Sequence, residues 1–369
     1  MIYLDHAATS LPKPPAVLAA IRRWFDEVGV SADRGDGARC QVARHEVAET
    51  RRRVAELTGV RTQRVAFVSG ATEGLNLTLR ALLRPGDAVL TTAFEHSSVA
   101  RPLVALQRER SLELQVLAPA ADGTLAIDRI AEALTGLRPR LFVFTHASNV
   151  TGFCLPAVDA CQLARKAGVL TLLDASQTAG LVDLHVGADV VVASGHKALH
   201  GPPGVGFVAA GDVDLPPQKQ GGTGSSRALA EHPATWPQAF EAGTPNTPAI
   251  FGLGAALSWL EEQRPERLLA RSLQHVDMLA ELLARKPGVR LLLPPRHARV
   301  PVLSFTHETF DPAELGALFD AADVHVRTGF HCAPWIHTHL GTDVAGTVRL
   351  SPGPFATAAQ LEAAAAVVH

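Results

Sequence analysis

The sequence lacks several features that would indicate particular classes of protein. Its 34 Lys and Arg residues nearly balance 36 Asp and Glu residues, and no block of five or six like charges occurs. We therefore expect neither nucleic acid nor a membrane surface as a partner. No segment reaches the ~18 consecutive apolar residues that span a bilayer. The first residues, MIYLDHAATSLPKPP, lack a basic flank followed by an apolar stretch, so the expected location is cytoplasmic.

Cysteine is scarce, and its spacing excludes two further classes of protein. The four cysteines are Cys40, Cys154, Cys161 and Cys332. They have neither the spacing of a metal site nor that of a disulfide framework in so long a chain. We therefore expect reduced thiols in a reducing compartment, of which one or two at most are reactive, and no metal site.

What is present is a patterned α/β sequence. A chain of 369 residues that is 47% hydrophobic is long enough for two domains. Between residues 45 and 210, short β-branched runs alternate with helix-like stretches such as 74–83 and 127–134, which is typical of a mostly parallel sheet covered by helices. The predicted strands are 64–69, 88–92, 112–117, 140–145, 169–174, 188–193 and 204–209.

The C-terminal third predicts a smaller α+β unit. Residues 211–248 are rich in Gly, Pro and Ser and predict an ordered loop. We expect helices over 250–262, 267–285 and from 357 onward, and strands over 300–305, 324–327 and 347–351. The predicted division is a large domain over 15–250 and a small domain made of 1–14 and 251–369.

Ligands in an open α/β sheet bind outside the carboxyl ends of the strands, so the residues after each strand are the candidate ligand-binding residues. Residues 69–74 (SGATEG), which include Ala71 and Thr72, lead into a helix N-terminus that suits a phosphate. Taken alone, the segment is better explained as a turn and a cap. Asp174 follows another strand, where a carboxylate could keep a pyridine nitrogen protonated or could cap the next helix.

Lys197 follows the next strand, within 194–197 (SGHK). A lysine in a desolvated pocket loses part of its proton affinity and can form an imine with an aldehyde. Most lysines are solvated surface residues, but the presence of Asp174 on the adjacent strand favours a functional role. Asn149 and His96 follow two other strands, where they could contact a ring oxygen and a ring face, or could simply be satisfied loop residues.

Two candidates lie in the C-terminal unit. Cys332 lies in a loop bounded by Gly and Pro, 327–334 (RTGFHCAP), which favours exposure over burial as a small apolar residue. Arg349 lies within a strand-like stretch and could hold a substrate carboxylate in a bidentate pair. A structural salt bridge explains Arg349 equally well from spacing alone.

Together these segments resemble the class V aminotransferase family of pyridoxal-phosphate enzymes, and within it the cysteine desulfurases and selenocysteine lyases of the short-loop group. The resemblance covers nearly the whole chain. The segments that carry it are 3–9 (YLDHAAT), 69–74, 95–96, 148–152, 174–177, 194–197, 221–222, 240–246, 327–334 and Arg349. It implies fold type I of the pyridoxal-phosphate transferases, with a large domain built on a mostly parallel seven-stranded sheet and a smaller α+β domain.

The resemblance also implies roles. Lys197 would hold the cofactor as a Schiff base, Asp174 would contact the pyridine nitrogen and His96 would stack on the ring. Gln177 and Asn149 would lie near the ring hydroxyl, and Arg349 would hold the substrate carboxylate. The phosphate would be held by the segment at Ala71 and Thr72, with Ser194 and His196; Thr244 would reach the phosphate of a second subunit, which implies a homodimer.

Cys332 matches the catalytic cysteine. Its thiolate would take the sulfur of L-cysteine, release alanine and pass the persulfide to an acceptor protein or thiol that the sequence does not name. Selenocysteine cleavage, another lyase or aminotransferase activity, and a non-catalytic scaffold are the alternatives.

Three segments depart from the family pattern. The substrate loop at 33–40 (DRGDGARC) lacks the usual histidine, His6 stands where asparagine is more usual, and Pro352 and Pro354 stiffen the segment after Arg349. His337 and His339 follow Cys332 at a spacing that does not share a helix face, so we expect no metal there.

Overall fold

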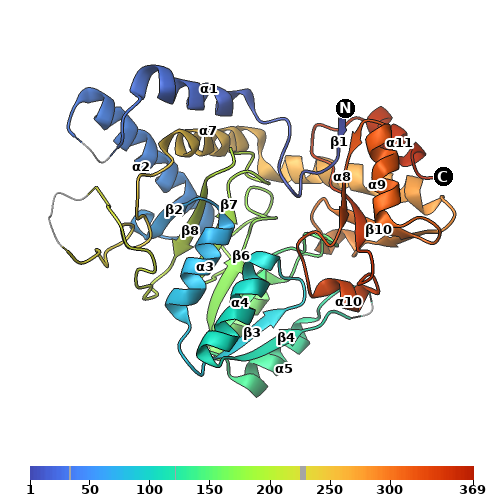
Figure 1. The fold of residues 1–369 in the computed structure, drawn as a ribbon, viewed down its shortest axis with the longest axis horizontal. Coiled ribbons are helices and arrows are strands. Elements are labelled where there is room, and N and C mark those ends of the chain that lie inside the picture. Colours follow the sequence, from blue (N-terminus) through green and yellow to red (C-terminus); the bar gives the residue numbers. More distant parts are fainter. Residues whose placement is uncertain (33–34, 121, 225–229) are drawn as a thin grey trace.

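The computed structural model describes residues 1–32, 35–120, 122–224 and 230–369, and its centre is a seven-stranded sheet (Figure 1). The strands lie in the order β2-β8-β7-β6-β5-β3-β4. All neighbours from β7 through β4 are parallel, while β8 is antiparallel to both β7 and β2. The prediction of a mostly parallel seven-stranded sheet is thereby confirmed. The strands are β2 Val65–Val68, β3 Ala88–Thr92, β4 Glu113–Leu117, β5 Leu141–Thr145, β6 Leu170–Asp174, β7 Val190–Ser194 and β8 Gly206–Ala210.

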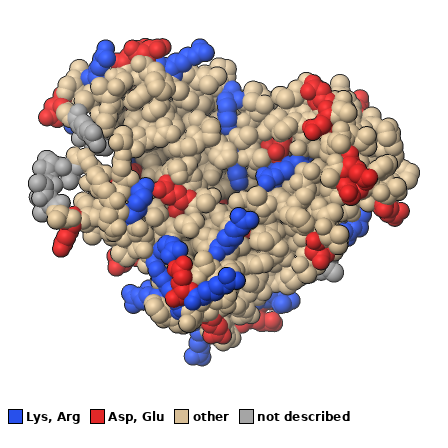
Figure 2. Space-filling view, in the orientation of Figure 1, with Lys and Arg blue, Asp and Glu red and all other residues tan. Residues whose placement is uncertain are grey.

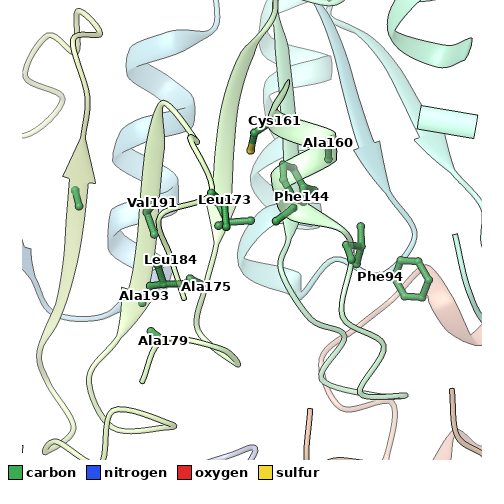
Figure 3. Close-up of a cluster of buried hydrophobic side chains, with 14 of the residues drawn as sticks. Phe94, Phe144, Ala160, Cys161, Leu173, Ala175, Ala179, Leu184, Val191 and Ala193 are labelled. Carbon is green, nitrogen blue, oxygen red and sulfur yellow. The ribbon is translucent and has the colours of Figure 1, made fainter. Parts of the chain in front are cut away.

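Side chains alternate across this sheet and build a core on each face. In β5, Phe142 and Phe144 join one hydrophobic cluster while Leu141 and Val143 join the other. Helices α3 and α4 cover the second cluster; α2, α5, α6 and α7 cover the first, part of which is drawn in Figure 3. A buried Leu or Phe contributes about 1.5–3 kcal/mol, so both faces stabilise the sheet that positions the site. The helices are α1 Pro15–Arg23, α2 Ala38–Thr58, α3 Ala71–Leu82, α4 Ser97–Arg110, α5 Ile127–Leu137, α6 Ala157–Lys166 and α7 Thr247–Gln263, with short η1 Trp24–Val28 and η2 Thr62–Arg64.

The C-terminal residues form a second, four-stranded antiparallel sheet in the order β12-β13-β10-β9. A third cluster of buried side chains packs this sheet against α8, α9 and α11. At the other end of the chain, Ile2 and Tyr3 pair in parallel with β11, so the first residues join the C-terminal unit. The elements are β1 Ile2–Tyr3, α8 Pro265–Ala284, β9 Val289–Leu292, η3 Arg296–Ala298, β10 Leu303–His307, α9 Pro312–Ala321, β11 Val324–His325, β12 Arg327–Gly329, α10 Ile336–Leu340, β13 Thr347–Leu350 and α11 Ala358–Ala366.

The C-terminal unit differs from its prediction in several respects, among them the short helix α10, which was not predicted. The single strand expected over 324–327 is two strands, because β11 pairs with β1 while β12 pairs with β13 in a different sheet. Strand β9 and helix α9 were not predicted. The division at residue 250 stays a prediction, and α7 packs against α1 and α2.

The described surface carries both signs of charge. On the face drawn in Figure 2, Lys and Arg side chains lie among Asp and Glu side chains. None of the helices in the described ranges is long and apolar enough to cross a membrane.

Candidate active site

The predicted residues gather at one edge of the large sheet. Strands β3, β5, β6 and β7 are parallel, so their carboxyl ends share that edge. His96, Asn149 and Lys197 follow β3, β5 and β7, and Asp174 is the last residue of β6. Strand β4, which follows β3 in the chain, lies on one side of β3. Strands β5, β6 and β7 lie on the other side of β3. The gap between β3 and β5 is therefore the point where strand order reverses, which is where open α/β sheets bind ligands.

The start of α3 is open to an anion. The backbone N–H of Ala71 donates to Ser194 Oγ at 3.0 Å, and no described side chain caps the helix at Gly70. Gly206 allows this close packing, since a Cβ there would lie 2.6 Å from the Ala193 carbonyl oxygen and 2.8 Å from Gly70 Cα. Thr72 is exposed beside this first turn. The uncapped N-terminus of a twelve-residue helix provides free N–H donors for a phosphate.

Asp174 and Lys197 interact electrostatically. Asp174 is 3% exposed, and its Oδ1 accepts from the backbone N–H of Ser176 at 2.9 Å. Turns and a β-bridge at Ala179, not a helix, follow Asp174, so the alternative that Asp174 caps a helix is wrong. Burial lowers the pKa of Lys197, and the carboxylate of Asp174 opposes that shift. The pair therefore combines an amine of lowered pKa with a nearby carboxyl group.

His96 is held as a neutral imidazole at the start of α4. Its Nδ1 accepts the backbone N–H of Ser98 at 3.1 Å, which leaves the ring proton on Nε2. Burial, followed by the charge of Lys197, lowers the pKa of His96 to about 4. Burial likewise lowers the pKa of His196 to about 4, with Lys197 as the next cause. Both rings are uncharged at neutral pH.

The two amides expected near a ring hydroxyl also join segments of the chain. Asn149 Nδ2 donates to the His331 carbonyl at 2.6 Å, while its Oδ1 is buried without a partner among the described residues. Gln177 Nε2 donates to the Ala7 carbonyl at 3.0 Å. The amides thus connect the sheet edge to the cysteine loop and to the N-terminal segment.

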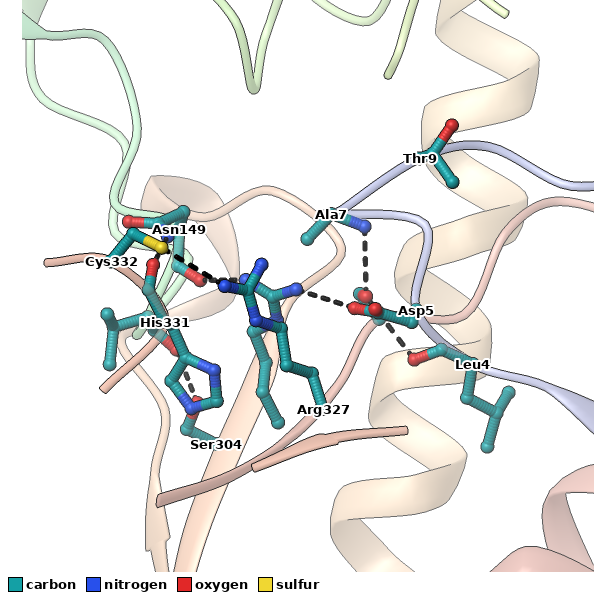
Figure 4. A network of polar contacts seen from close by, with 12 residues as sticks. Leu4, Asp5, Ala7, Thr9, Asn149, Ser304, Arg327, His331 and Cys332 are labelled. Atoms are coloured by element: carbon teal, nitrogen blue, oxygen red, sulfur yellow. Dashed lines mark hydrogen bonds and ion pairs between the residues drawn. The ribbon is translucent and has the colours of Figure 1, made fainter. Parts of the chain in front are cut away.

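Arg349 is completely buried and already has an ionic partner. Its guanidinium donates to Asp5 Oδ1 at 2.5 Å and to the Asn149 carbonyl at 2.9 Å. Its Nε has no hydrogen-bond partner in the described part of the chain. Figure 4 shows the network, which runs from Cys332 and Arg327 on one side to Asp5 on the other. The salt-bridge explanation of Arg349 therefore holds, and the Nε–H and one N–H on each terminal nitrogen remain as donors for a substrate carboxylate.

Cys332 lies exposed in a strained loop. Both His331 and Cys332 have left-handed backbone angles, with φ of 49° and 57°, which non-glycine residues seldom adopt. Arg327 lies against the thiol, with its guanidinium nitrogen 3.1 Å from Sγ, and the Cys332 carbonyl accepts from Ser97 N–H at 2.7 Å. The guanidinium is thus close enough to donate to Sγ, and the thiolate is the nucleophilic form of cysteine.

The histidines after Cys332 have different surroundings. His337 is buried, where its Nε2 donates to the Phe330 carbonyl at 3.0 Å and its Nδ1 lies 2.8 Å from Thr342 Oγ1. It therefore fixes the base of the cysteine loop, whereas His339 is exposed.

Two departures from the family pattern meet in one cavity. His6 and residues 352–354 line a cavity of about 40 Å³ together with Gln177, Lys197 and His200. A Cβ at Gly353 would overlap the His6 ring, so the glycine makes room for the histidine. Burial lowers the pKa of His6 to about 3 and that of His200 to about 4, so both rings are neutral. In the third departure, Asp33 and Arg34 lie outside the described residues.

Thr244 is exposed. It lines a hollow of about 230 Å³ with Ser69 and Glu73, on the outer side of α3's first turn. Arg327, Asp5 and Glu95 lie in the segments 327–334, 3–9 and 95–96, but no local pattern predicts an individual role for any of them. No local pattern pairs Asp5 with Arg349, which is 344 residues away.

Comparison with known proteins agrees with this geometry. The family model Aminotransferase class-V matches residues 2–364. A cysteine desulfurase of Salmonella choleraesuis is 32% identical over 347 residues, which cover 90% of this chain and 84% of the relative. Two solved structures share the fold at 26% identity, each covering 99% of this chain and 93% of the other: an apo cysteine desulfurase from Thermococcus onnurineus, with a TM-score of 0.89, and a cysteine desulfurase (S-sulfonic acid) from Escherichia coli, with a TM-score of 0.88. The chain belongs to the class-V aminotransferase family.

Proposed function

We propose that this chain is a pyridoxal-phosphate-dependent cysteine desulfurase, which converts L-cysteine to L-alanine and leaves the sulfur on Cys332 as a persulfide. The observation that carries the proposal is the juxtaposition of an arginine-stabilised, exposed thiol with a buried lysine of lowered pKa. Electrostatic interactions link Lys197 to Asp174, Arg327 and Cys332. In an aminotransferase or another lyase, the thiol of Cys332 would be incidental to the reaction.

The described side chains fit pyridoxal phosphate. Lys197 would hold it covalently, Asp174 would meet its ring nitrogen and His96 its ring face. The uncapped start of α3, with Ser194, suits the phosphate, and Asn149 keeps a buried, unpartnered oxygen at the same edge of the sheet. When bound, the cofactor supplies an electron sink that acidifies the substrate Cα–H.

The chain's own residues remove the proton, bind the carboxylate and accept the sulfur. Lys197, whose amine burial biases toward the free base, takes the proton from the substrate Cα. Arg349 holds the substrate carboxylate through the donors that Asp5 and Asn149 leave free. The Cys332 thiolate attacks the substrate sulfur: an S–S bond forms, the Cβ–S bond breaks, and its electron pair stays on Cβ, which takes up a proton. Lys197 returns the proton that it removed to Cα. Cysteine and the Cys332 thiol thus become alanine and the Cys332 persulfide.

The proposal extends to the oligomeric state, the sulfur acceptor, the cellular compartment and the domain division. Thr244, exposed beside the first turn of α3, would reach the phosphate of a second copy, so that the active form is a homodimer. The persulfide would pass to an acceptor protein or a small thiol. A reducing cytoplasm suits an enzyme that depends on an exposed thiol. The two sheets would belong to separate domains, with the cysteine loop on the smaller one.

The test is release of sulfide and alanine from L-cysteine in the presence of a reductant. We expect both products from the wild type and from the control variant Cys154→Ala, which removes a partly buried thiol from another loop. Neither Cys332→Ala nor Lys197→Ala should release them at more than about a hundredth of the wild-type rate. Alanine release by Cys332→Ala from selenocysteine only would favour a selenocysteine lyase. Equal rates for Cys332→Ala and wild type on L-cysteine would refute the role of the thiol.

A further inference from the structure

Glu95 is a fully buried carboxyl group at the floor of the site, beside the residues assigned above. Its side chain is 0% exposed and lies between the ends of β3 and β5. Phe94 and Phe144, which precede Glu95 and Thr145 in the chain, belong to the hydrophobic cluster beneath (Figure 3). An acidic group in this position requires a physical reason, because burying a charge is expensive unless it is paired.

The sheet opens at this position. Strands β3 and β5 pair only through Val89–Leu141 and Leu90–Phe142, although each strand continues for several residues. Beyond Phe142, strand β5 continues to pair with β6, which places Thr145 opposite Asp174. The opening leaves the N–H of Thr145 without a strand partner on the β3 side.

Glu95 fills that opening. Its Oε1 accepts from Thr145 N–H at 3.0 Å and from Thr92 Oγ1 at 2.6 Å, so one oxygen joins the ends of both strands. The next residue, His96, begins α4, and the partner of Thr145 in the sheet is Asp174. A single carboxyl oxygen thus connects the segment that carries His96 to the strand pair that carries Asp174.

The second carboxyl oxygen of Glu95, Oε2, bears on whether this side chain is ionised. Glu95 Oε2 is buried and has no hydrogen-bond partner within the described chain. An ionised carboxylate would leave half of its charge unsolvated next to the carboxylate of Asp174. A neutral acid leaves an unpartnered hydroxyl there instead, which costs far less than an unpartnered charge.

We propose that Glu95 is a positioning residue of the cofactor site, a neutral acid whose Oε1 holds the β3 and β5 ends apart at a fixed width and so places His96 opposite Asp174. This inference rests on the proposed function for its link to the cofactor. The neutral acid itself is a property of the protein without cofactor.

The titratable neighbours support a neutral acid. Burial, and to a smaller extent the charge of Asp174 on β6, raises the pKa of Glu95 to about 8. His96 before α4 and His146 after β5 stay neutral, because burial lowers the pKa of each to about 4. Lys197 after β7 interacts with Asp174 and His96. The one charged group named among the causes acting on Glu95 is Asp174, which favours the protonated acid, so with a pKa of about 8 Glu95 keeps its proton at neutral pH.

The first test measures unfolding of the cofactor-free protein against pH. Unfolded glutamate ionises near pH 4.3, so between about pH 5 and pH 7.5 the folded wild type holds one proton that the unfolded chain has lost. Wild-type stability must then fall with rising pH relative to Glu95→Gln, which cannot ionise. We expect the ratio of unfolding constants, wild type over Glu95→Gln, to rise about tenfold per pH unit. The control Glu113→Gln, which changes an exposed glutamate of β4, should show no such trend. A flat ratio for Glu95→Gln would overturn the neutral acid.

The second test measures equilibrium binding of pyridoxal phosphate by its visible absorbance. Glu95→Gln keeps the accepting oxygen, so its dissociation constant should stay within about threefold of wild type. Glu95→Ala removes the acceptor and should weaken binding at least tenfold; if it does not fold, Thr92→Val, which removes one donor, should weaken binding several-fold. Equal loss in the glutamine and alanine variants would overturn the positioning role. If the wild type binds no cofactor, the proposed function fails, while the pH trend of the first test still decides whether the acid is neutral.

Discussion

The pair formed by Asp5 and Arg349 gives the sharpest prediction about stability. Both side chains are almost wholly buried, with exposures of 7% and 0%, and they lie 2.5 Å apart. Asp5→Asn keeps the size of the side chain and an oxygen acceptor but removes the charge, so Arg349 becomes a buried cation without a counterion. Breaking a buried pair in this way costs about 3–5 kcal/mol. Burial already lowers the pKa of Arg349, and Asp5 is the main group that opposes the shift.

The assay is denaturant unfolding of the cofactor-free protein. A matched control is Glu109→Gln, which breaks the exposed pair of Glu109 with Arg80 at 3.0 Å and should cost less than about 1 kcal/mol. In the double variant Asp5→Asn with Arg349→Met, the unpaired charge is gone, so part of the lost stability should return. A loss below about 1 kcal/mol for Asp5→Asn alone would refute the reasoning, because Arg349 would then have another means of solvation.

The same variant also tests the role of the pair in substrate binding. Asp5 fixes one side of the guanidinium, so its loss should misorient the donors left for the substrate carboxylate. We expect KM for L-cysteine to rise about tenfold while kcat changes less, since the interaction is present in both ground and transition states. A fall in kcat with constant KM would contradict that assignment.

Three further predictions concern the cysteine loop. Iodoacetamide at pH 8 should alkylate Cys332 far faster than Cys161, because Cys332 is exposed and burial raises the pKa of Cys161 to about 12; comparable labelling of both peptides in mass spectrometry would contradict this. Gly346→Ala should destabilise the fold by roughly 3 kcal/mol or more in thermal or denaturant unfolding, because φ is 80° and the new Cβ would overlap the backbone of Gly329. Gly341→Ala is its control: φ is 64° and no described atom lies within 4 Å of the new Cβ, so the loss should be about 1 kcal/mol. Arg327→Met should lower the rate of alanine release about 10- to 100-fold, because a hydrogen bond to a charged group contributes about 1.5–3 kcal/mol. An unchanged rate would exclude Arg327 from thiol activation.

The sequence determined the elements whose formation depends on local pattern. The seven strands of the large sheet are short β-branched or apolar runs, and the structure places each within a few residues of its predicted range. Placing His96, Asn149, Asp174 and Lys197 at one edge followed from the rule that parallel strands end together. Helix α9 was missed although its capping box, Asp311 with Glu314, and the proline after Asp311 predict a helix start.

Tertiary structure alone decided the contacts between distant segments. Residues 324–329 form two strands in two sheets, because the N-terminal segment adds β1 to the first of them. The partner of Arg349 is Asp5, and the function of Glu95 as a spacer exists only because β3 and β5 separate after two pairs of residues. Periodicity reports which face of an element is buried, and motifs report which chemistry is available. Neither specifies which buried polar group meets which other, because that choice depends on how the packed elements bring distant side chains within hydrogen-bond distance.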